Sequence, residues 1–400
     1  MDTLTQLGYD ALDKGLIPDL VVRRAIRVLC NQRLREISQA SMHASVEAKW
    51  QYIEQLKLKP VAIETDKANE QHYEVSTDFI KSCLGPRMKY SCCLYPTGKE
   101  SLERAEILML DSYCEKAKLQ DGMDVLDLGC GWGSLSLYLA EARSIHKYPN
   151  SRITSLSNSS TQKVYIDAQA ALKGLKNLEV FTGDVKEYDF AGKRAFDRIL
   201  SIEMFEHMKN YEFLLQKVST WLKPNKDAAT GEALLFVHIF CHRDTPYVES
   251  PTSHLVRASA KFSSGSRQRY HFEEGDGWMT KHFFSGGTMP SFDLFTYFQK
   301  DLVLQRSWWL NGKHYGQTCE DWLKLQDSNR KNWLSSTNSS QLVTPSKTRP
   351  QVEQTDKDRQ LEGLKTFYRF RVFFMACAEF FALNGGESWG VGHYLFKKRD

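Results

Sequence analysis

The sequence predicts an α/β protein built around a parallel sheet. Short β-rich runs alternate with helical segments through the middle of the chain, and this alternation is typical of βαβ units. The runs cover residues 124–128, 152–156, 178–182, 196–202 and 233–240. The 400 residues can bury a large core, and 42% apolar with 26% charged residues is ordinary globular usage. Collagen-like, disordered and disulfide-scaffold classes are therefore excluded.

Net charge and cysteine content indicate which partners and which cellular compartment to expect. Lys and Arg number 53 against 49 Asp and Glu, and the net charge of +4 is too small to indicate a nucleic-acid partner. The nine cysteines have no repeated CxxC spacing, which favours reduced thiols and a cytoplasmic location. We expect no secretory signal at the N-terminus, and the longest apolar run, at 372–383, is too short to span a bilayer.

Three regions are expected along the chain. Residues 1–100 should be mainly helical, and 101–245 should hold the alternating strands and helices of the sheet. Residues 246–400 should supply pocket insertions and the C-terminal strands that complete the sheet. Within this last region, 250–269 is rich in Ser and Arg, and 335–358 has no apolar periodicity. We expect both to be surface insertions, and the second to be disordered.

A glycine-rich turn follows the first strand. Gly129, Gly131 and Gly133 let the backbone turn sharply and approach a ligand, and the next helix begins with free N–H groups. The GxGxG spacing is one residue short of the dinucleotide pattern. Asp127 ends the strand, where a carboxylate would repel a pyrophosphate but pair with an ammonium group. This combination favours S-adenosylmethionine (SAM) over NAD, and a purely structural turn is the alternative.

The ends of the next two strands carry further candidate cofactor contacts. The second strand ends without an acid, so Ser157, Asn158 or Gln162 is expected to hydrogen-bond the ribose hydroxyls. After the third strand, Asp184 is placed to accept from the adenine amino group, and Val185 to pack on the ring. A loop-capping role is the alternative for Asp184.

Three titratable residues follow the fourth strand. If a helical turn begins at Glu203, then Glu206 and His207 lie on the same helix face at i+3 and i+4. Methyl transfer to an amine needs a free lone pair, so an alkylammonium must first lose a proton. A carboxylate that binds the ammonium, with a carboxylate–imidazole pair that accepts the proton, would meet this need. An acidic helix start with a surface histidine is the alternative.

Two other patterns suggest weaker hypotheses. His238, Cys241 and His242 resemble a zinc set, but they end a strand and have no clear third ligand, so we predict no metal site. The aromatic residues of a helix at 367–381 should lie mainly in the core, and some of them could wall an apolar or cationic substrate.

Motifs along nearly the whole chain resemble one enzyme family. They read LDLGCGWGSLSLYLA, ITSLSNSSTQK, SIEMFEHMKNY, HYEVSTDF, MKYSCCLYP, LFVHIFCH, WMTKHFFSGGTMPS, WWLNGKHYGQT and AEFFALNGGESWGVGHYLFKK. Together they are similar to the cyclopropane fatty acid synthase superfamily of SAM-dependent methyltransferases. Within it, the coclaurine N-methyltransferase-like branch is the more similar one. The insertions near 250–269 and 335–358 depart from that branch.

The resemblance implies the fold, the cofactor and the site. The fold would be a Rossmann-like, seven-stranded class I methyltransferase sheet with a helical N-terminal cap and insertions after strand five. Tyr90 and Ser91 would hold the methionine part of SAM, and the glycine, ribose and adenine positions named above would hold the rest. In the amine-methylating branch, Glu203, Glu206 and His207 handle the substrate amine.

The sequence therefore predicts a SAM-dependent N-methyltransferase acting on a small amine, such as an aralkylamine or isoquinoline-like alkaloid. Glu206 and His207 would accept the proton and Glu203 would anchor the ammonium. One alternative is a cyclopropane synthase acting on unsaturated phospholipid chains, with weak membrane-surface contact. That branch uses a bicarbonate held by Cys, Glu, His and Tyr, and Cys130 matches its cysteine. A non-catalytic SAM-binding protein is another alternative, and a homodimer is left open.

Overall fold

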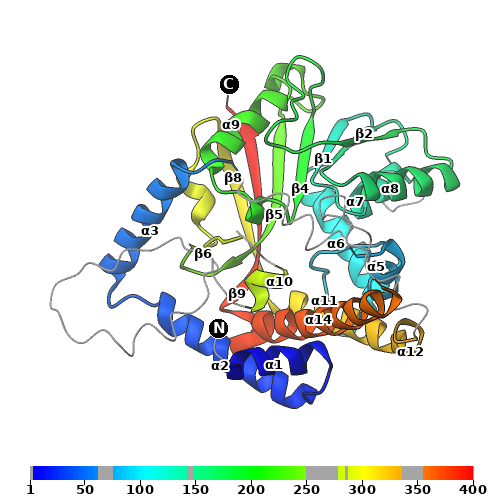
Figure 1. Ribbon diagram of the computed structural model, residues 1–400. Helices are drawn as coiled ribbons and strands as arrows, with labels where there is room; N and C mark the ends of the chain where they lie inside the picture. The colour runs from blue at the N-terminus through cyan, green and yellow to red at the C-terminus, as the bar shows by residue number, and fades with distance from the viewer. Residues whose placement is uncertain are drawn as a thin grey trace.

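A seven-stranded sheet forms the centre of the computed structural model (Figure 1). The strands lie in the order β3-β2-β1-β4-β5-β9-β8, and the first five are parallel. Strand β9 runs antiparallel between β5 and β8. The strand bounds are β1 Asp124–Leu128, β2 Arg152–Ser157, β3 Leu178–Thr182, β4 Arg198–Ile202, β5 Leu234–His242, β8 Leu302–Asn311 and β9 Trp389–Lys398. The predicted Rossmann-like sheet is confirmed.

The structure describes residues 3–61, 75–141, 148–248, 278–283, 287–335 and 355–399. The expected insertion at 250–269 lies outside these residues, as does most of the second one. The last residues of that second segment are helical, because Thr355 and Asp358 form a capping box that begins the next helix. For this short part, the expectation of disorder was wrong.

Helices surround the sheet and also cover one end of it (Figure 1). Their bounds are α1 Thr3–Asp13, α2 Asp19–Ile37, α3 Met42–Lys57, α5 Thr77–Cys83, α6 Leu102–Lys116, α7 Ser134–Ala140, α8 Ser160–Leu172, α9 Tyr211–Trp221, α10 Trp278–His282, α11 Lys313–Ser328, α12 Arg330–Trp333 and α14 Asp356–Ala382. A two-stranded sheet joins β6 Tyr247–Val248 to β7 Thr288–Met289, and 3-10 turns lie at Phe205–His207, Asn225–Asp227, Leu294–Tyr297 and Leu383–Gly386.

Alternate residues of the central strands enter two separate cores. In β1, Val125 packs with residues of α6, α7 and α14, whereas Leu126 packs with residues of α3 and α9. In β5, Phe236 joins the first core and Val237 the second. Successive side chains of a strand point to opposite faces, so a sheet covered on both faces needs apolar residues at nearly every position. This explains the continuous apolar runs in the sequence.

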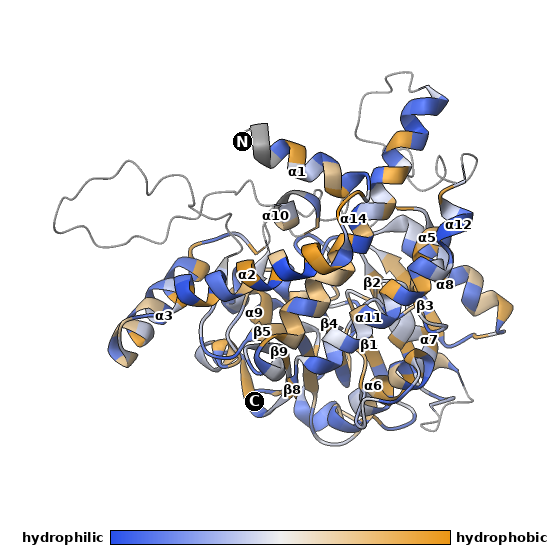
Figure 2. Cartoon of the chain, turned by 90° about the horizontal axis from the view of Figure 1, so that it is seen from below, coloured by the Kyte–Doolittle hydropathy of each residue, from blue (hydrophilic) through white to orange (hydrophobic). Residues whose placement is uncertain are grey.

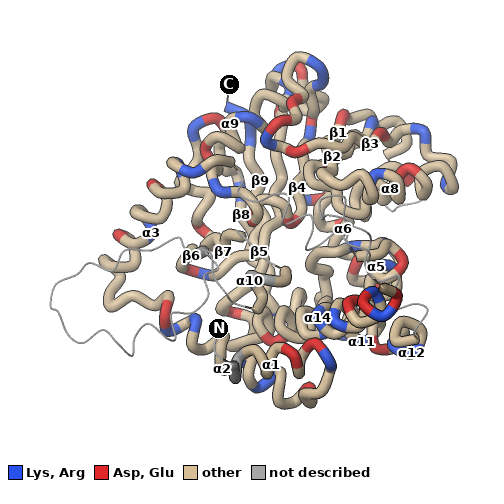
Figure 3. Tube along the Cα trace, viewed as in Figure 1, with Lys and Arg blue, Asp and Glu red and all other residues tan. Residues whose placement is uncertain are grey.

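Helices α1, α2, α11 and α14 form a layer beyond the carboxyl ends of the parallel strands (Figure 1). Ion pairs join the helices of this layer, and charges of both signs lie side by side there (Figure 3). Arg23 of α2 contacts Glu320 of α11 at 2.5 Å and Glu379 of α14 at 3.0 Å. Arg371 of α14 contacts Asp19 of α2 at 2.5 Å. These partly buried pairs hold α2 against the two C-terminal helices.

The surface of α2 mixes polar and apolar stretches (Figure 2). Leu20 and Val28 are exposed on it. Arg23 and Arg27 instead turn toward the carboxylates of α11 and α14. Among the helices that the structure describes, none combines the length and apolar character needed to cross a membrane.

Arg198 ties the amino-terminal edge of the sheet together. Its side chain is fully buried at the start of β4. It donates to the carbonyl oxygens of Ala117 at 2.8 Å and Glu232 at 2.7 Å, and to Thr230 Oγ1 at 2.9 Å. A buried carbonyl that loses its donor pays the full cost of desolvation.

We expect Arg198→Met to lower the free energy of unfolding by about 3–5 kcal/mol, because several buried acceptors lose their donor at once. Chemical denaturation followed by circular dichroism would measure this loss. Arg152→Met is the control, since Arg152 is 68% exposed in its pair with Asp124, and its expected cost is below about 1 kcal/mol. Equal losses in the two variants would contradict the role given to Arg198.

Candidate active site

A pocket of about 310 Å³ lies at the carboxyl ends of β1 and β4, between the sheet and the helical layer. Ligands of open α/β sheets bind at this edge. Nine of the residues predicted from the sequence line it. They are Tyr90, Ser91, Asp127, Gly129, Gly131, Gln162, Glu203, Glu206 and His207. The structure therefore brings the glycine turn and the polar cluster after β4 to one cavity.

Five predicted cofactor residues are not part of this pocket wall. They are Gly133, Ser157, Asn158, Asp184 and Val185. Ser157 lies directly behind the wall, where its hydroxyl donates to Gln162 Oε1 at 2.7 Å. Asp184 accepts from the backbone N–H of Lys186 at 2.8 Å, as a loop-capping acid does. The ribose and adenine assignments of these residues stay predictions.

The glycine turn leaves room and donors for a polar ligand. Gly129 and Gly131 have φ of 80° and 52°, a region that side chains rarely adopt. A Cβ on Gly129 would meet the side chain of Met204 at 2.7 Å, whereas one on Gly131 would enter open space. At the pocket wall, Ser134 Oγ and Gln162 Nε2 are buried and have no hydrogen-bond partner among the described residues. Unsatisfied donors beside open space fit a nucleoside-bearing ligand such as SAM.

Asp127 lies at the inner wall of the same pocket. Its side chain is buried, and one carboxyl oxygen accepts from Ser136 Oγ at 2.5 Å. Burial raises the pKa of Asp127 to about 6, because the charged form loses its hydration. A cationic group that entered the pocket would stabilise the carboxylate.

The backbone at Glu203 is not helical, so the expected helix face shared with Glu206 and His207 is wrong. Glu203 has φ of 50°, and the 3-10 turn begins only at Phe205. A non-glycine residue in this region costs roughly 1–3 kcal/mol and often marks a functional site. The backbone N–H of Glu203 donates to the carbonyl of His238 at 2.9 Å, which holds the bend in place. All three residues nevertheless line the same pocket.

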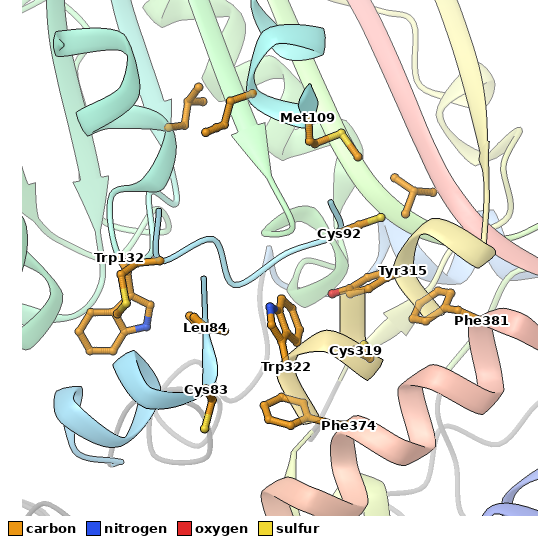
Figure 4. Packing of buried hydrophobic residues seen from close by; sticks show 14 of the residues in the cluster. Cys83, Leu84, Cys92, Met109, Trp132, Tyr315, Cys319, Trp322, Phe374 and Phe381 are labelled. Carbon is orange, nitrogen blue, oxygen red and sulfur yellow. The ribbon is translucent and has the colours of Figure 1, made fainter. Parts of the chain in front are cut away.

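Two donors and the ring of His238, from distant parts of the chain, contact the carboxyl group of Glu203. Oε1 accepts from the backbone N–H of Cys92 at 3.0 Å and lies 3.0 Å from His238 Nε2. Oε2 accepts from the hydroxyl of Tyr315 at 2.5 Å. Figure 4 shows Cys92 and Tyr315 near one another above the aromatic residues of α11 and α14. This carboxylate therefore has one fixed orientation.

Glu206 lies next to this carboxylate but lacks its donors. Its side chain is 1% exposed, and Oε2 has no hydrogen-bond partner within the described part of the chain. Burial, with the negative charge of Glu203, raises the pKa of Glu206 well above its ordinary value. Loss of hydration and the neighbouring carboxyl group thus both favour the neutral form of Glu206. An unsatisfied acceptor at the wall is suited to a hydrogen-bond donor on a ligand.

Sequence reasoning missed two of the residues around Glu203. His238 entered only as part of a rejected zinc set, and Tyr315 was not singled out. The signal available for His238 was a polar residue inside an otherwise apolar strand, at the sheet edge where ligands bind. The cysteine beside Glu203 is Cys92, not Cys130, whose thiol contacts the carbonyl of Gly131.

Aromatic side chains of the helical layer form the opposite wall. Tyr315 stacks on Phe381 with ring centroids 4.4 Å apart (Figure 4). The ring centroid of Trp322 lies 5.4 Å from that of Tyr90. Phe373 and Phe380 also line the cavity, whereas Phe367, Phe370 and Phe374 of α14 lie in the core. The expected division of this helix between core and pocket wall agrees with these positions. A flat, apolar or cationic molecule would fit such a wall.

The chain is similar to known methyltransferases in sequence and in fold. The family model for mycolic acid cyclopropane synthetase matches residues 62–343. (S)-coclaurine N-methyltransferase of Thalictrum flavum subsp. glaucum is 35% identical over 390 residues, which cover 97% of this chain and 94% of the relative. Cyclopropane-fatty-acyl-phospholipid synthase of Escherichia coli (strain K12) is 28% identical over 255 residues, which cover 63% of this chain and 54% of the relative.

A solved structure is similar along the whole length. The crystal structure of coclaurine N-methyltransferase bound to N-methylheliamine and S-adenosylhomocysteine has a TM-score of 0.83 and 32% identity, and the match covers 99% of this chain and all of the other. Fold and cofactor thus define a SAM-dependent methyltransferase. The chain belongs to the cyclopropane fatty acid synthase superfamily of these enzymes, in its coclaurine N-methyltransferase-like branch.

We propose that Asp127 pairs with the ammonium group of the cofactor, and this makes binding depend on pH. Below pH 6 the Asp127 carboxyl is mostly neutral, since its pKa is raised to about 6. The cofactor α-amino group stays charged up to about pH 8. Between pH 5 and pH 7 we therefore expect the affinity for S-adenosylhomocysteine to rise by up to about tenfold.

Isothermal titration calorimetry across this pH range would measure the change. Asp127→Asn should bind more weakly at pH 7 and lose most of the dependence on pH. A variant that keeps the wild-type pH dependence would show that another group causes it.

Proposed function

We propose that this enzyme methylates the nitrogen of a small amine, such as an aralkylamine or an isoquinoline-like alkaloid. The observation that carries the proposal is the pair Glu203 and Glu206 at the wall of the cofactor pocket. One oxygen of Glu206 has no partner among the described residues, although it is buried. A protonated amine would satisfy this acceptor and offset the charge of Glu203, because an ammonium has donors and positive charge together.

The substrate class is supported by the aromatic wall and by the relatives. Tyr315 and Phe381 line the same pocket as the two carboxyl groups, and an aromatic wall suits an aromatic amine with a cationic nitrogen. The similar solved structure contains N-methylheliamine, an N-methylated isoquinoline-type amine. The relatives that match nearly the full chain include (S)-coclaurine and pavine N-methyltransferases.

In the proposed site the cofactor supplies a methyl group on a sulfonium sulfur. Tyr90 and Ser91 would contact its methionine part, and Asp127 would bind its ammonium. Because Gly131 has no side chain, the backbone there could approach the cofactor closely. Gln162 would hydrogen-bond the ribose of the cofactor. These residues act by holding and orienting, which brings donor and acceptor into reacting geometry.

The residues around the protonated amine have to remove a proton from it before its nitrogen can attack the methyl group. We assign the ammonium anchor to Glu203, whose fixed orientation suits a binding role. Glu206, together with the neighbouring His207, would accept the proton. Arrival of the cation lowers the cost of charge on Glu206, so the group can ionise and act as a base once the substrate is bound.

The lipid alternative is less well supported. Cyclopropane synthases of solved structure are 18–20% identical, so their likeness concerns the fold. The Escherichia coli enzyme matches less than two thirds of the chain, whereas the N-methyltransferase relatives match almost all of it.

We also propose a cytoplasmic location, because all nine cysteines have free thiols.

A panel of acceptors with methyl-labelled SAM tests the proposed function. The panel would hold heliamine, other secondary and primary aralkylamines, and vesicles of unsaturated phospholipid. Mass spectrometry should find labelled methyl groups on the nitrogen of one or more amines and none on the lipid. Labelled lipid with unlabelled amines would overturn the proposal in favour of the cyclopropane synthase alternative.

Two substitutions test the proton acceptor. Glu206→Gln and His207→Asn should each lower kcat about 100-fold or more, because general-base catalysis contributes roughly this factor. The affinity for S-adenosylhomocysteine should change little. Glu187→Gln is the control, since Glu187 is exposed. Turnover that survives in both variants, with cofactor still bound, would show that the assignment is incorrect.

A further inference from the structure

A line of hydrogen bonds runs from the pocket through the protein to its surface. It begins at Glu203, whose Oε1 lies 3.0 Å from His238 Nε2. The other nitrogen of that ring, Nδ1, lies 2.8 Å from His393 Nε2. The second nitrogen of His393, Nδ1, lies 2.8 Å from Lys116 Nζ. Four titratable side chains, from the bend after β4, from β5, from β9 and from α6, are thus connected in series.

The two histidines lie opposite each other in the sheet. His238 of β5 and His393 of β9 are register partners, and both are fully buried. Polar groups in such a core need partners, and an apolar pair would fill the space at lower cost. Burial lowers the pKa of His238 to about 4 and that of His393 well below its ordinary value. Both rings are therefore neutral, with one nitrogen that donates and one that accepts.

Lys116 forms the outer end of the line. It is the last residue of α6 and is partly exposed, with its ammonium 5.4 Å from the ring centre of Trp308. Glu115 and Arg306 are the charged neighbours that act on it, in opposite directions. Burial lowers the pKa of Lys116 to about 8, so its neutral and charged forms are both present near neutral pH. A group with this property can take up a proton and release it to water.

A second line from His238 ends inside the protein. The hydroxyl of Tyr113 lies 2.9 Å from His238 Nδ1 and accepts from Lys89 Nζ at 3.0 Å. Lys89 is 1% exposed and donates also to Ser91 and to the carbonyl of Cys92. This branch orients the His238 ring, whereas the branch through His393 reaches the surface.

The proposed reaction needs such a path. Methylation of a protonated amine by SAM releases one proton in each turnover, and the pocket is walled largely by apolar side chains. We propose that Glu203, His238, His393 and Lys116 form a relay that carries this proton from the pocket to solvent. This inference rests on the proposed amine substrate and goes beyond it by naming the residues that remove the proton.

Each transfer breaks one bond to hydrogen and forms another. The N–H bond of the ammonium breaks and an O–H bond forms on the carboxyl pair of Glu203 and Glu206. The proton on Glu203 then moves to His238 Nε2, while the proton on His238 Nδ1 moves to His393 Nε2. The proton on His393 Nδ1 moves to neutral Lys116 and from there to water or buffer base. Each ring then carries its proton on Nε2, so each ring has to regain its Nδ1 tautomer before the next turnover.

Kinetics of outer-end variants test the relay. Lys116→Met and His393→Gln should lower kcat for heliamine about tenfold, with KM and S-adenosylhomocysteine affinity unchanged. Added imidazole should restore much of the rate in Lys116→Met, because a soluble base can replace the lost acceptor. The solvent deuterium isotope effect on kcat should rise in both variants. Lys118→Met is the control, since Lys118 lies two residues away and pairs with Glu232 on the surface.

The outcomes separate the relay from the proposed function. If the wild-type enzyme turns over amines while Lys116→Met behaves like Lys118→Met, or if imidazole restores nothing, the relay is refuted and the N-methyltransferase function stands. If the wild-type enzyme methylates no amine, the proposed function fails.

If the wild-type enzyme methylates no amine, the relay can still be tested by a measurement that needs no turnover. In protein with ¹⁵N-labelled histidine, titration of Lys116 near pH 8 should shift the ring nitrogens of His393 and, to a smaller extent, those of His238. Lys116→Met should abolish these shifts, and Lys118→Met should keep them. Ring nitrogens that do not respond to this titration would overturn the relay even in an inactive enzyme.

Discussion

A carboxylate that is taken out of water must be surrounded by donors, and the site of this enzyme is built around that requirement at Glu203. The groups around it are two donors, the backbone N–H of Cys92 and the hydroxyl of Tyr315, and the ring of His238. They belong to the segment after α5, to β5 and to α11, which are far apart in the sequence. The arrangement exists only when the sheet, the N-terminal region and the C-terminal helices are assembled together. The backbone of Glu203 adopts a strained left-handed conformation, and this conformation directs the carboxyl group to this point.

The helical layer over the sheet edge controls how dry the pocket is. Arg23 and Arg371 join α2 to α11 and α14 through partly buried ion pairs, and aromatic residues of α11 and α14 line the pocket together with the two carboxyl groups. A wall of low polarity strengthens the electrostatic interactions inside it. The raised pKa of Glu206 and the lowered pKa of His238 both follow from this exclusion of water. The same exclusion makes the removal of a proton a structural problem, which the line through His393 to Lys116 would solve.

Local features were predictable where a few neighbouring residues decide them. The strand before Gly129, the positive φ required in the turn and the apolar runs of a sheet covered on both faces follow from backbone sterics and side-chain periodicity. Strand ends were less accurate. β5 continues to His242 because it pairs with Trp389 of β9, and a distant partner leaves no trace in a short window of sequence. The conformation of Glu203 was mistaken for the same reason, since a helical spacing of three and four residues holds only if the backbone is helical.

The sequence alone determined the class of protein and the cofactor, because a strand, a glycine turn and a helix start use contacts between residues that are close in the chain. It also placed Glu206 and His207 near the reacting end of the sheet. Only the tertiary structure decided which side chains hold Glu203, and why Glu206 remains without a partner among the described residues. His238 shows the difference most clearly: in the sequence it belonged to a weak zinc pattern, and in the fold it connects Glu203 to His393. Burial and hydrogen bonding between distant strands set the chemistry of a histidine, and neither can be read from its neighbours in the chain.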